Sequence, residues 1–97
     1  KDIAKKIALD KYDWGKDQFS CVNKIFTQES DWKWNATNPT SGAYGIPQSL
    51  PANKMASEGD DWKTNPATQI KWGLNYIAGR YGSPSAAKTF WLAHNWY

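Results

Sequence analysis

The sequence contains very little of the side-chain chemistry on which many active sites depend. Its 97 residues include one cysteine, Cys21, one histidine, His94, and one arginine, Arg80. A single cysteine excludes an intrachain disulfide, and a lone histidine without clustered Cys or acidic residues argues against a metal site. A nucleophilic pair of Cys21 and His94 is disfavoured, because a lone thiol beside Phe19 and Val22 is more commonly a small buried hydrophobe. We therefore expect no metal, no cofactor and a reduced, buried thiol.

Long apolar runs and a strong charge of either sign are also missing. No run is long enough to span a bilayer and no signal-peptide pattern is present, so we expect a mature, excised domain without membrane insertion. The net charge of +3 suits an anionic surface. The lysines are dispersed, however, and Arg80 is the only arginine, so we expect no nucleic-acid partner.

Period-two alternation and internal repeats are absent as well, and apolar residues recur instead at helical spacing. This pattern predicts an all-α fold. A length of 97 residues leaves room for one core, so residues 1–97 are expected to form a single domain. The predicted elements are a helix over 2–13, a helix over 17–29, a loop over 32–45, a short helix after Pro51, a helix from Asn65-Pro66 to Gly82, and a last helix from Ser83-Pro84.

Glu29, one of only two glutamates, is the most informative of the charged residues. Val22, Ile25 and Phe26 precede it at helical spacing, so Glu29 falls on or beside the apolar face of the helix. Partial desolvation raises the pKa of a carboxyl group, as a general acid working near neutral pH requires.

A second carboxylate, which glycoside hydrolases normally need, is not evident beside Glu29. Asp31 is two residues away, and residues at that spacing do not face each other on a helix. Glu58, Asp60 and Asp61 belong to a polar turn in which the acidic side chains are expected to be solvated.

Four short motifs carry a family resemblance from about residue 19 to the end of the chain. They are Glu29-Ser30, Gly45-Ile46-Pro47-Gln48, Gly73-Leu74-Asn75-Tyr76-Ile77 and Ala93-His94-Asn95. In the order and approximate spacing of these motifs, the chain resembles the lytic transglycosylase and goose-type lysozyme group. The motifs of that group are Glu-Ser, Gly-Leu-Met-Gln, Gly-x-x-Tyr-Leu and Ala-Tyr-Asn. The run from Ser41 to Met55 is more similar still to secreted members from Gram-positive bacteria.

The resemblance implies a compact, lysozyme-like domain of four to five helices with a long substrate-binding loop. It also implies cleavage of the β-1,4 bond between N-acetylmuramic acid and N-acetylglucosamine in peptidoglycan, with a 1,6-anhydromuramyl product. Glu29 would be the single acid and base, because the nucleophile is the sugar's own 6-hydroxyl. The expected substrate-binding residues are Ser30, Tyr44, Gly45, Gln48, Tyr76, His94, Asn95 and Trp32.

Two alternatives remain at this point. One is a hydrolase of the same fold, a muramidase in which water replaces the sugar hydroxyl. The other is a non-catalytic module that binds cell-wall glycan, which the intact Glu29-Ser30 pair disfavours. In each case we expect a monomer that acts on glycan strands, secreted to the cell wall or delivered as a phage lysin.

The chain departs from the family pattern in ways that bear on its chemistry. His94 stands where the family has a tyrosine near the acid; a neutral imidazole could donate a hydrogen bond, whereas a protonated one would lower the Glu29 pKa. Pro47 replaces a methionine, and Ser85 is expected where some relatives have a disulfide partner for Cys21. Of the seven tryptophans, we expect Trp32 and Trp34 to line a glycan groove and Trp72 and Trp91 to fill the core.

Overall fold

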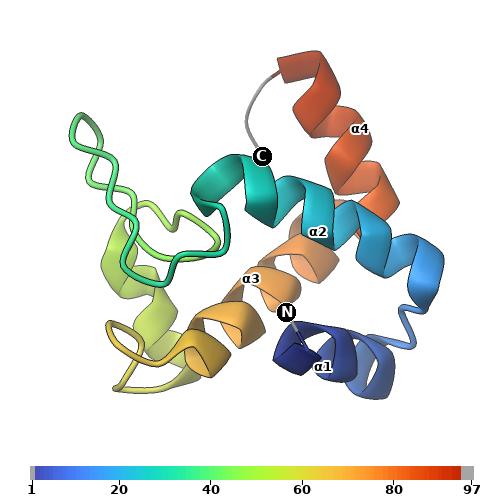
Figure 1. Ribbon diagram of the computed structural model, residues 1–97, viewed down its shortest axis with the longest axis horizontal. Helices are drawn as coiled ribbons and strands as arrows, with labels where there is room; N and C mark the ends of the chain where they lie inside the picture. Colours follow the sequence, from blue (N-terminus) through green and yellow to red (C-terminus); the bar gives the residue numbers. More distant parts are fainter. Residues whose placement is uncertain (1, 95–97) are drawn as a thin grey trace.

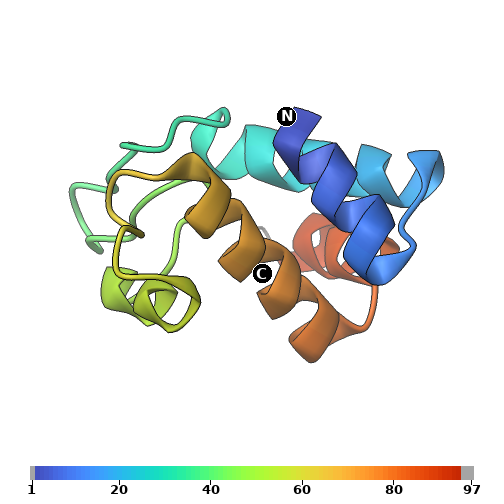
Figure 2. The same ribbon diagram turned by 90° about the horizontal axis from the view of Figure 1, so that it is seen from below.

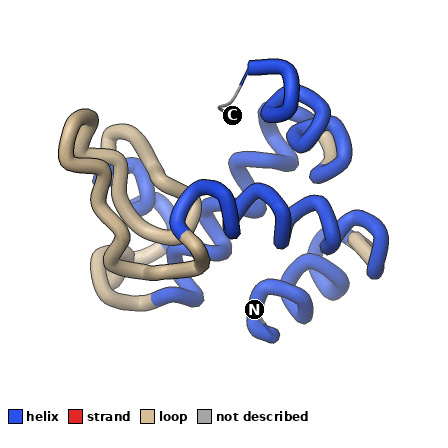
Figure 3. Tube along the Cα trace, turned by 45° about the horizontal axis from the view of Figure 1, so that its top comes forward, coloured by secondary structure: helices blue, strands red, loops and turns tan. Residues whose placement is uncertain are grey.

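The helices lie where the apolar periodicity predicts them. A computed structural model describes residues 2–94. It contains α1 (Asp2–Tyr12), α2 (Lys16–Ser30), the 3₁₀ helix η1 (Ala52–Glu58), α3 (Pro66–Tyr81) and α4 (Pro84–His94) (Figure 1). The described residues form no β-strand, and the loops gather at one end of the molecule (Figure 3). The predicted all-α class is confirmed, and the radius of gyration of 12.2 Å is that of a compact domain.

The first two helices each end at an aspartate in the left-handed conformation. Asp13 has φ 57° and Asp31 has φ 53°. The N–H of Asp31 donates to the carbonyl of Thr27 at 3.0 Å, and the N–H of Trp14 donates to the carbonyl of Ala8 at 3.0 Å. Aspartate tolerates this conformation better than most residues, so these turns stop each helix and satisfy its last carbonyls. Glu29 is thereby placed in the last turn of α2.

The predicted boundaries of α3 are confirmed at both ends. The Asn65 side chain accepts a hydrogen bond from the N–H of Ala67 at 2.9 Å, and Pro66 occupies the first turn. Gly82 ends the helix with φ 84°. An Asn cap, a first-turn proline and a terminal glycine are strong helix signals, which explains why the sequence alone placed this element.

The helices pack around one apolar cluster, in which α2 contacts α4, and α3 contacts α1, η1 and α4 (Figure 2). Phe26 is fully buried at its centre, and an added Cβ at Gly73 would lie 2.7 Å from the Phe26 ring. Glycine at position 73 therefore allows α3 to pass close to α2. The fully or almost fully buried apolar members include Ala4, Ala8, Val22, Ile25, Phe26, Ile46, Ile70, Leu74, Ile77 and Ala87.

The loop between α2 and α3 is held by polar contacts as well as by the buried apolar side chains of Ile46, Pro47 and Met55. Gln69 of α3 is fully buried, and its Oε1 accepts a hydrogen bond from the N–H of Ile46 at 2.9 Å. Its Nε2 donates to the carbonyls of Trp34 at 2.9 Å and Trp62 at 3.0 Å. One side chain thus joins three distant points of the loop to α3.

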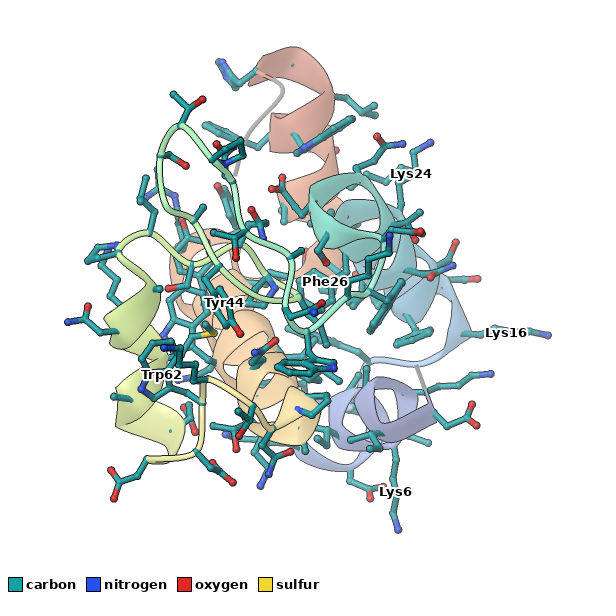
Figure 4. The ribbon with its side chains drawn as sticks, turned by 60° about the vertical axis from the view of Figure 1, so that its left-hand side comes forward. Lys6, Lys16, Lys24, Phe26, Tyr44 and Trp62 are labelled. Carbon is teal, nitrogen blue, oxygen red and sulfur yellow. The ribbon has the colours of Figure 1, made fainter. Side chains whose placement is uncertain are left out.

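The surface is polar around this core. Lys6, Lys16 and Lys24 point outwards, whereas Phe26 points into the interior (Figure 4). Within residues 2–94, none of the helices combines the length and the apolar character needed to cross a bilayer.

Candidate active site

Glu29 lies half-buried in the last turn of α2, beside the end of α4. Burial raises the pKa of its carboxyl group above the ordinary value of 4.5, and a hydrogen bond from Trp91 opposes part of that rise. The Trp91 Nε1 donates to Glu29 Oε1 at 3.2 Å. Burial disfavours the charged carboxylate, so the predicted upward shift of the Glu29 pKa is confirmed with the predicted cause.

Glu29 is part of the wall of a cavity of about 210 Å³ between the helices α2 and α3 and the loop that connects them. Helices α2, α3 and η1 contribute to this wall, together with the turn that follows Gly45. The lining residues are Glu29, Pro47, Gln48, Ser49, Leu50, Lys54, Trp72 and Tyr76. Three residues that the sequence marked, Glu29, Gln48 and Tyr76, therefore line one cavity.

Trp72 and Tyr76 form an aromatic wall on the α3 side of the cavity. They are one helical turn apart, with ring centroids 5.2 Å apart and planes inclined by 18°. Stacked aromatic rings present a flat apolar surface of the kind that packs against the apolar face of a sugar.

Gln48 adopts φ 55° and uses both amide protons within the loop. Its Nε2 donates to the carbonyls of Ala36 and Gly45, each at 2.9 Å. The part of Gln48 that can serve a substrate is therefore its side-chain oxygen, an acceptor, because both amide protons are already engaged.

Ser30 and Gly45 shape the turn that carries Gln48. The Ser30 hydroxyl is buried, 2.7 Å from the carbonyl of Ile46 and 3.2 Å from that of Phe26, so it links the end of α2 to the turn. Gly45 has φ 83°, and an added Cβ would lie 2.7 Å from Gln69 Oε1. Neither residue lines the cavity, and both hold in place the turn that carries Gln48.

Tyr44 and Trp32 lie outside the cavity. The Tyr44 hydroxyl donates to the carbonyl of Lys63 at 2.8 Å, and its ring meets Trp62 edge to face (Figure 4). Trp32 packs edge to face against Phe26, with centroids 5.3 Å apart, and its Nε1 donates to Asn23. Trp32 therefore extends the core, and neither Trp32 nor Trp34 is among the lining residues.

His94 is exposed in the last turn of α4, with its ring 4.2 Å from that of Phe90. The hydrogen bond that Glu29 receives from α4 comes from Trp91, one turn earlier. A donor to Glu29 is therefore present on α4 at position 91, and a role of His94 in the site stays a prediction. Asn95, also expected in the site, lies outside the described residues.

Two other acidic side chains that the sequence considered, those of Asp61 and Glu58, are engaged elsewhere. Asp61 is exposed, and hydrogen bonds from Asn65 and Thr68 lower its pKa. Glu58 accepts a hydrogen bond from Asn75 at 3.3 Å. Within residues 2–94, Glu29 is the only carboxylate among the residues that line the cavity, and Lys54, at the exposed rim, is the only cation there. No group of three His, Cys, Asp or Glu side chains within residues 2–94 is arranged to hold a metal ion.

Two sequence-based predictions need correction. Trp72 and Trp91 were expected to fill the core, but both are half-buried, one in the cavity wall and one against Glu29. Cys21 is free, but it is half-buried rather than fully buried. Helical periodicity gives the face of a residue but not the position of that face relative to a cavity or to the surface, which is why these two predictions failed.

Ser85 lies at the start of α4 beside Gln18 of α2, with its N–H 3.0 Å from Gln18 Oε1. That Ser85 stands at the position of a disulfide partner for Cys21 stays a prediction.

Comparisons with known proteins are consistent with this geometry. A family model described as "Transglycosylase SLT domain" matches residues 10–96. The chain is also 36% identical over 76 residues to a protein of Staphylococcus xylosus called "Probable transglycosylase IsaA". That alignment covers 77% of this chain and 27% of the relative, so the chain spans about a quarter of the relative's length. No solved structure matches the chain.

Proposed function

Because the chain belongs to the transglycosylase SLT family, we propose that it is a peptidoglycan lytic transglycosylase domain in which Glu29 is the single acid and base. The observation that carries the proposal is the cavity itself. It contains one half-buried carboxyl group with a raised pKa and no second carboxylate among its lining residues. A raised pKa keeps a larger share of Glu29 protonated near neutral pH, as a general acid requires.

The reaction needs two proton transfers at one carboxyl group. Protonated Glu29 gives its proton to the glycosidic oxygen, and the bond from that oxygen to C1 of N-acetylmuramic acid breaks. The resulting carboxylate removes the proton of the 6-hydroxyl of the same sugar, whose oxygen bonds to C1. No water is consumed, the product is a 1,6-anhydromuramyl end, and Glu29 is protonated again. The tethered nucleophile makes the second step effectively unimolecular.

The remaining lining residues supply the substrate contacts. The Trp72–Tyr76 pair offers an apolar face for a sugar ring, and the Gln48 side-chain oxygen can accept the N–H of an N-acetyl group. Lys54 places a cation at the rim, where it can attract the carboxylates that peptidoglycan carries on its peptides. We place the site of action at the cell wall, outside the membrane, because that is where this substrate lies.

The test is the mass of the products released from purified peptidoglycan. A transglycosylase yields anhydro-muropeptides that are one water lighter than hydrolytic products, so the mass spectrum separates the proposal from a muramidase. Products carrying the extra water would replace the proposed reaction with hydrolysis.

Glu29→Gln is expected to lower the rate by about 10²–10⁴-fold while binding to insoluble peptidoglycan is retained. The chain offers a matched control in its only other glutamate, because Glu58→Gln makes the same chemical change outside the cavity. An active Glu29→Gln protein with unchanged circular dichroism would contradict the single-acid mechanism. If the unsubstituted protein binds the wall but releases no product, the chain is a binding module.

A further inference from the structure

The contact between Trp91 and Glu29 joins two helices at the reactive group. Trp91 belongs to α4, Glu29 to α2, and the two helices pack against each other. The indole N–H is a donor only, and it neither gains nor loses a proton in the accessible pH range. Its hydrogen bond to Glu29 Oε1 therefore persists whether the carboxyl group is neutral or charged.

We propose that Trp91 is the positioning residue of the catalytic acid: its indole N–H holds Glu29 Oε1, so that Oε2 is the oxygen that carries the transferable proton. This inference rests on the proposed function, in which Glu29 is the acid and base. It gives Trp91 the hydrogen-bonding role that the family resemblance associates with the tyrosine at the position of His94.

The assignment of the proton follows from hydrogen-bond valence. A neutral carboxyl group has one oxygen that accepts and one that carries the proton. The carbonyl oxygen of a carboxyl group is a stronger acceptor than its hydroxyl oxygen, so the Trp91 donor at Oε1 favours the form in which the proton resides on Oε2. Glu29 lines the cavity, and a single fixed orientation of its acid proton is what a positioned general acid needs.

The same N–H also favours the state that forms after proton transfer. A hydrogen bond to a carboxylate is stronger than one to a neutral carboxyl group, so Trp91 stabilises the ionised product of the acid step. In agreement, the Trp91 hydrogen bond lowers the Glu29 pKa while burial raises it. The other titratable residues that line the cavity with Glu29 are Lys54 on η1 and Tyr76 on α3, and neither is among the causes of the shift.

A row of aromatic rings fixes the part of α4 that carries Trp91. Tyr76 meets Tyr81 edge to face at 6.3 Å, and Tyr81 contacts Phe90 at 5.4 Å. Because Tyr76 also lines the cavity, this row runs from the cavity wall to the residue next to Trp91. The packing of α4 against α3 therefore determines where the indole N–H points.

The test is Trp91→Phe, which keeps an aromatic ring and removes the N–H. The Glu29 pKa is measured by NMR on protein labelled with ¹³C at the glutamate carboxyl groups. Since the chain has only two glutamates, two signals are expected, and Glu58→Gln identifies them. Leu92→Ala is the control, because Leu92 is the next residue of α4 and its side chain is 59% exposed.

Trp91→Phe is expected to raise the Glu29 pKa further, since the stabilisation of the carboxylate is lost. The decline of activity at high pH should move to higher pH, and the maximal rate should fall by about tenfold. Leu92→Ala should leave both unchanged. An unaltered Glu29 pKa in Trp91→Phe, or a slower rate with an unmoved pH profile, would overturn the positioning role. A raised pKa combined with an active Glu29→Gln protein would instead overturn the proposed function.

Discussion

The helical part of this domain and the loop over residues 31–65 are held in place by different physical means. The helices bury an apolar cluster around Phe26, with Leu74 and Ile77 fully buried beside it. The loop contributes Ile46 to that cluster and also buries Pro47 and Met55, and hydrogen bonds with Gln69 and Ser30 join it to the helices. Apolar packing is non-directional and tolerant, whereas buried hydrogen bonds require particular partners at particular distances.

The cavity lies at the boundary between these two parts. Glu29, Trp72 and Tyr76 come from the helices, whereas Gln48 and Lys54 come from the loop and η1. In the proposed function, the acid is thus carried by the helices, and substrate contacts are added by the loop segment that hydrogen bonds join to them. Damage to the core should unfold the whole domain, and damage to the polar anchors should displace the loop first.

Phe26→Ala is expected to have the largest effect. Removing a fully buried ring at the centre of the cluster should destabilise the domain by about 3–5 kcal/mol, because it leaves a cavity and loses apolar burial. Urea unfolding followed by circular dichroism measures the loss. A loss of activity without a change in helix stability would contradict the division between core and loop.

Gln69→Leu should cost about 3 kcal/mol, since the change leaves the Ile46 N–H and the Trp34 and Trp62 carbonyls without their partner. We expect amide hydrogen exchange to become faster in residues 31–65 than in α1 and α2. Activity should fall while the helices stay intact. Uniform acceleration across the domain would show that the loop and the core are one cooperative unit.

Ser30→Ala should cost about 1 kcal/mol, because the hydroxyl that joins α2 to the Ile46 carbonyl is lost. Ser20→Ala is the matched control, since it makes the same change at an exposed position of the same helix. Thermal unfolding of both variants measures the difference. Equal melting temperatures would mean that the Ser30 link contributes nothing to stability.

The smallest expected effect is the pH dependence of the free energy of unfolding that arises from Glu29. The pKa of Glu29 in the folded protein lies above 4.5, because burial disfavours the charged carboxylate. The contribution of Glu29 to stability is therefore fully present below its pKa in the unfolded protein, and it is lost as the pH rises through its pKa in the folded protein. Glu29→Gln has no such loss, so its stability relative to the unsubstituted protein should increase from about pH 4 to about pH 7. A pH-independent difference in urea unfolding would argue against burial as the cause.

The sequence by itself determined the helices and indicated the proposed catalytic acid. Apolar spacing marked α1 and α2, the Asn65 cap, Pro66 and Gly82 marked α3, and Glu29 was identified by its place on an apolar face. These features depend on contacts within one turn or one helix, which the order of residues expresses directly.

Only the tertiary structure decided which side chains meet. Gln69 joins points of the loop that are far apart in sequence, and Trp91 donates a hydrogen bond to Glu29 across 62 positions. Ser30 lies beside the acid in sequence, yet its hydroxyl is bonded to backbone carbonyls. These hydrogen bonds depend on how α2, α3 and α4 pack, because side chains one turn apart on a helix contact different neighbours. Residue order specifies each helix face, but the packing of the helices selects the residue that completes the site.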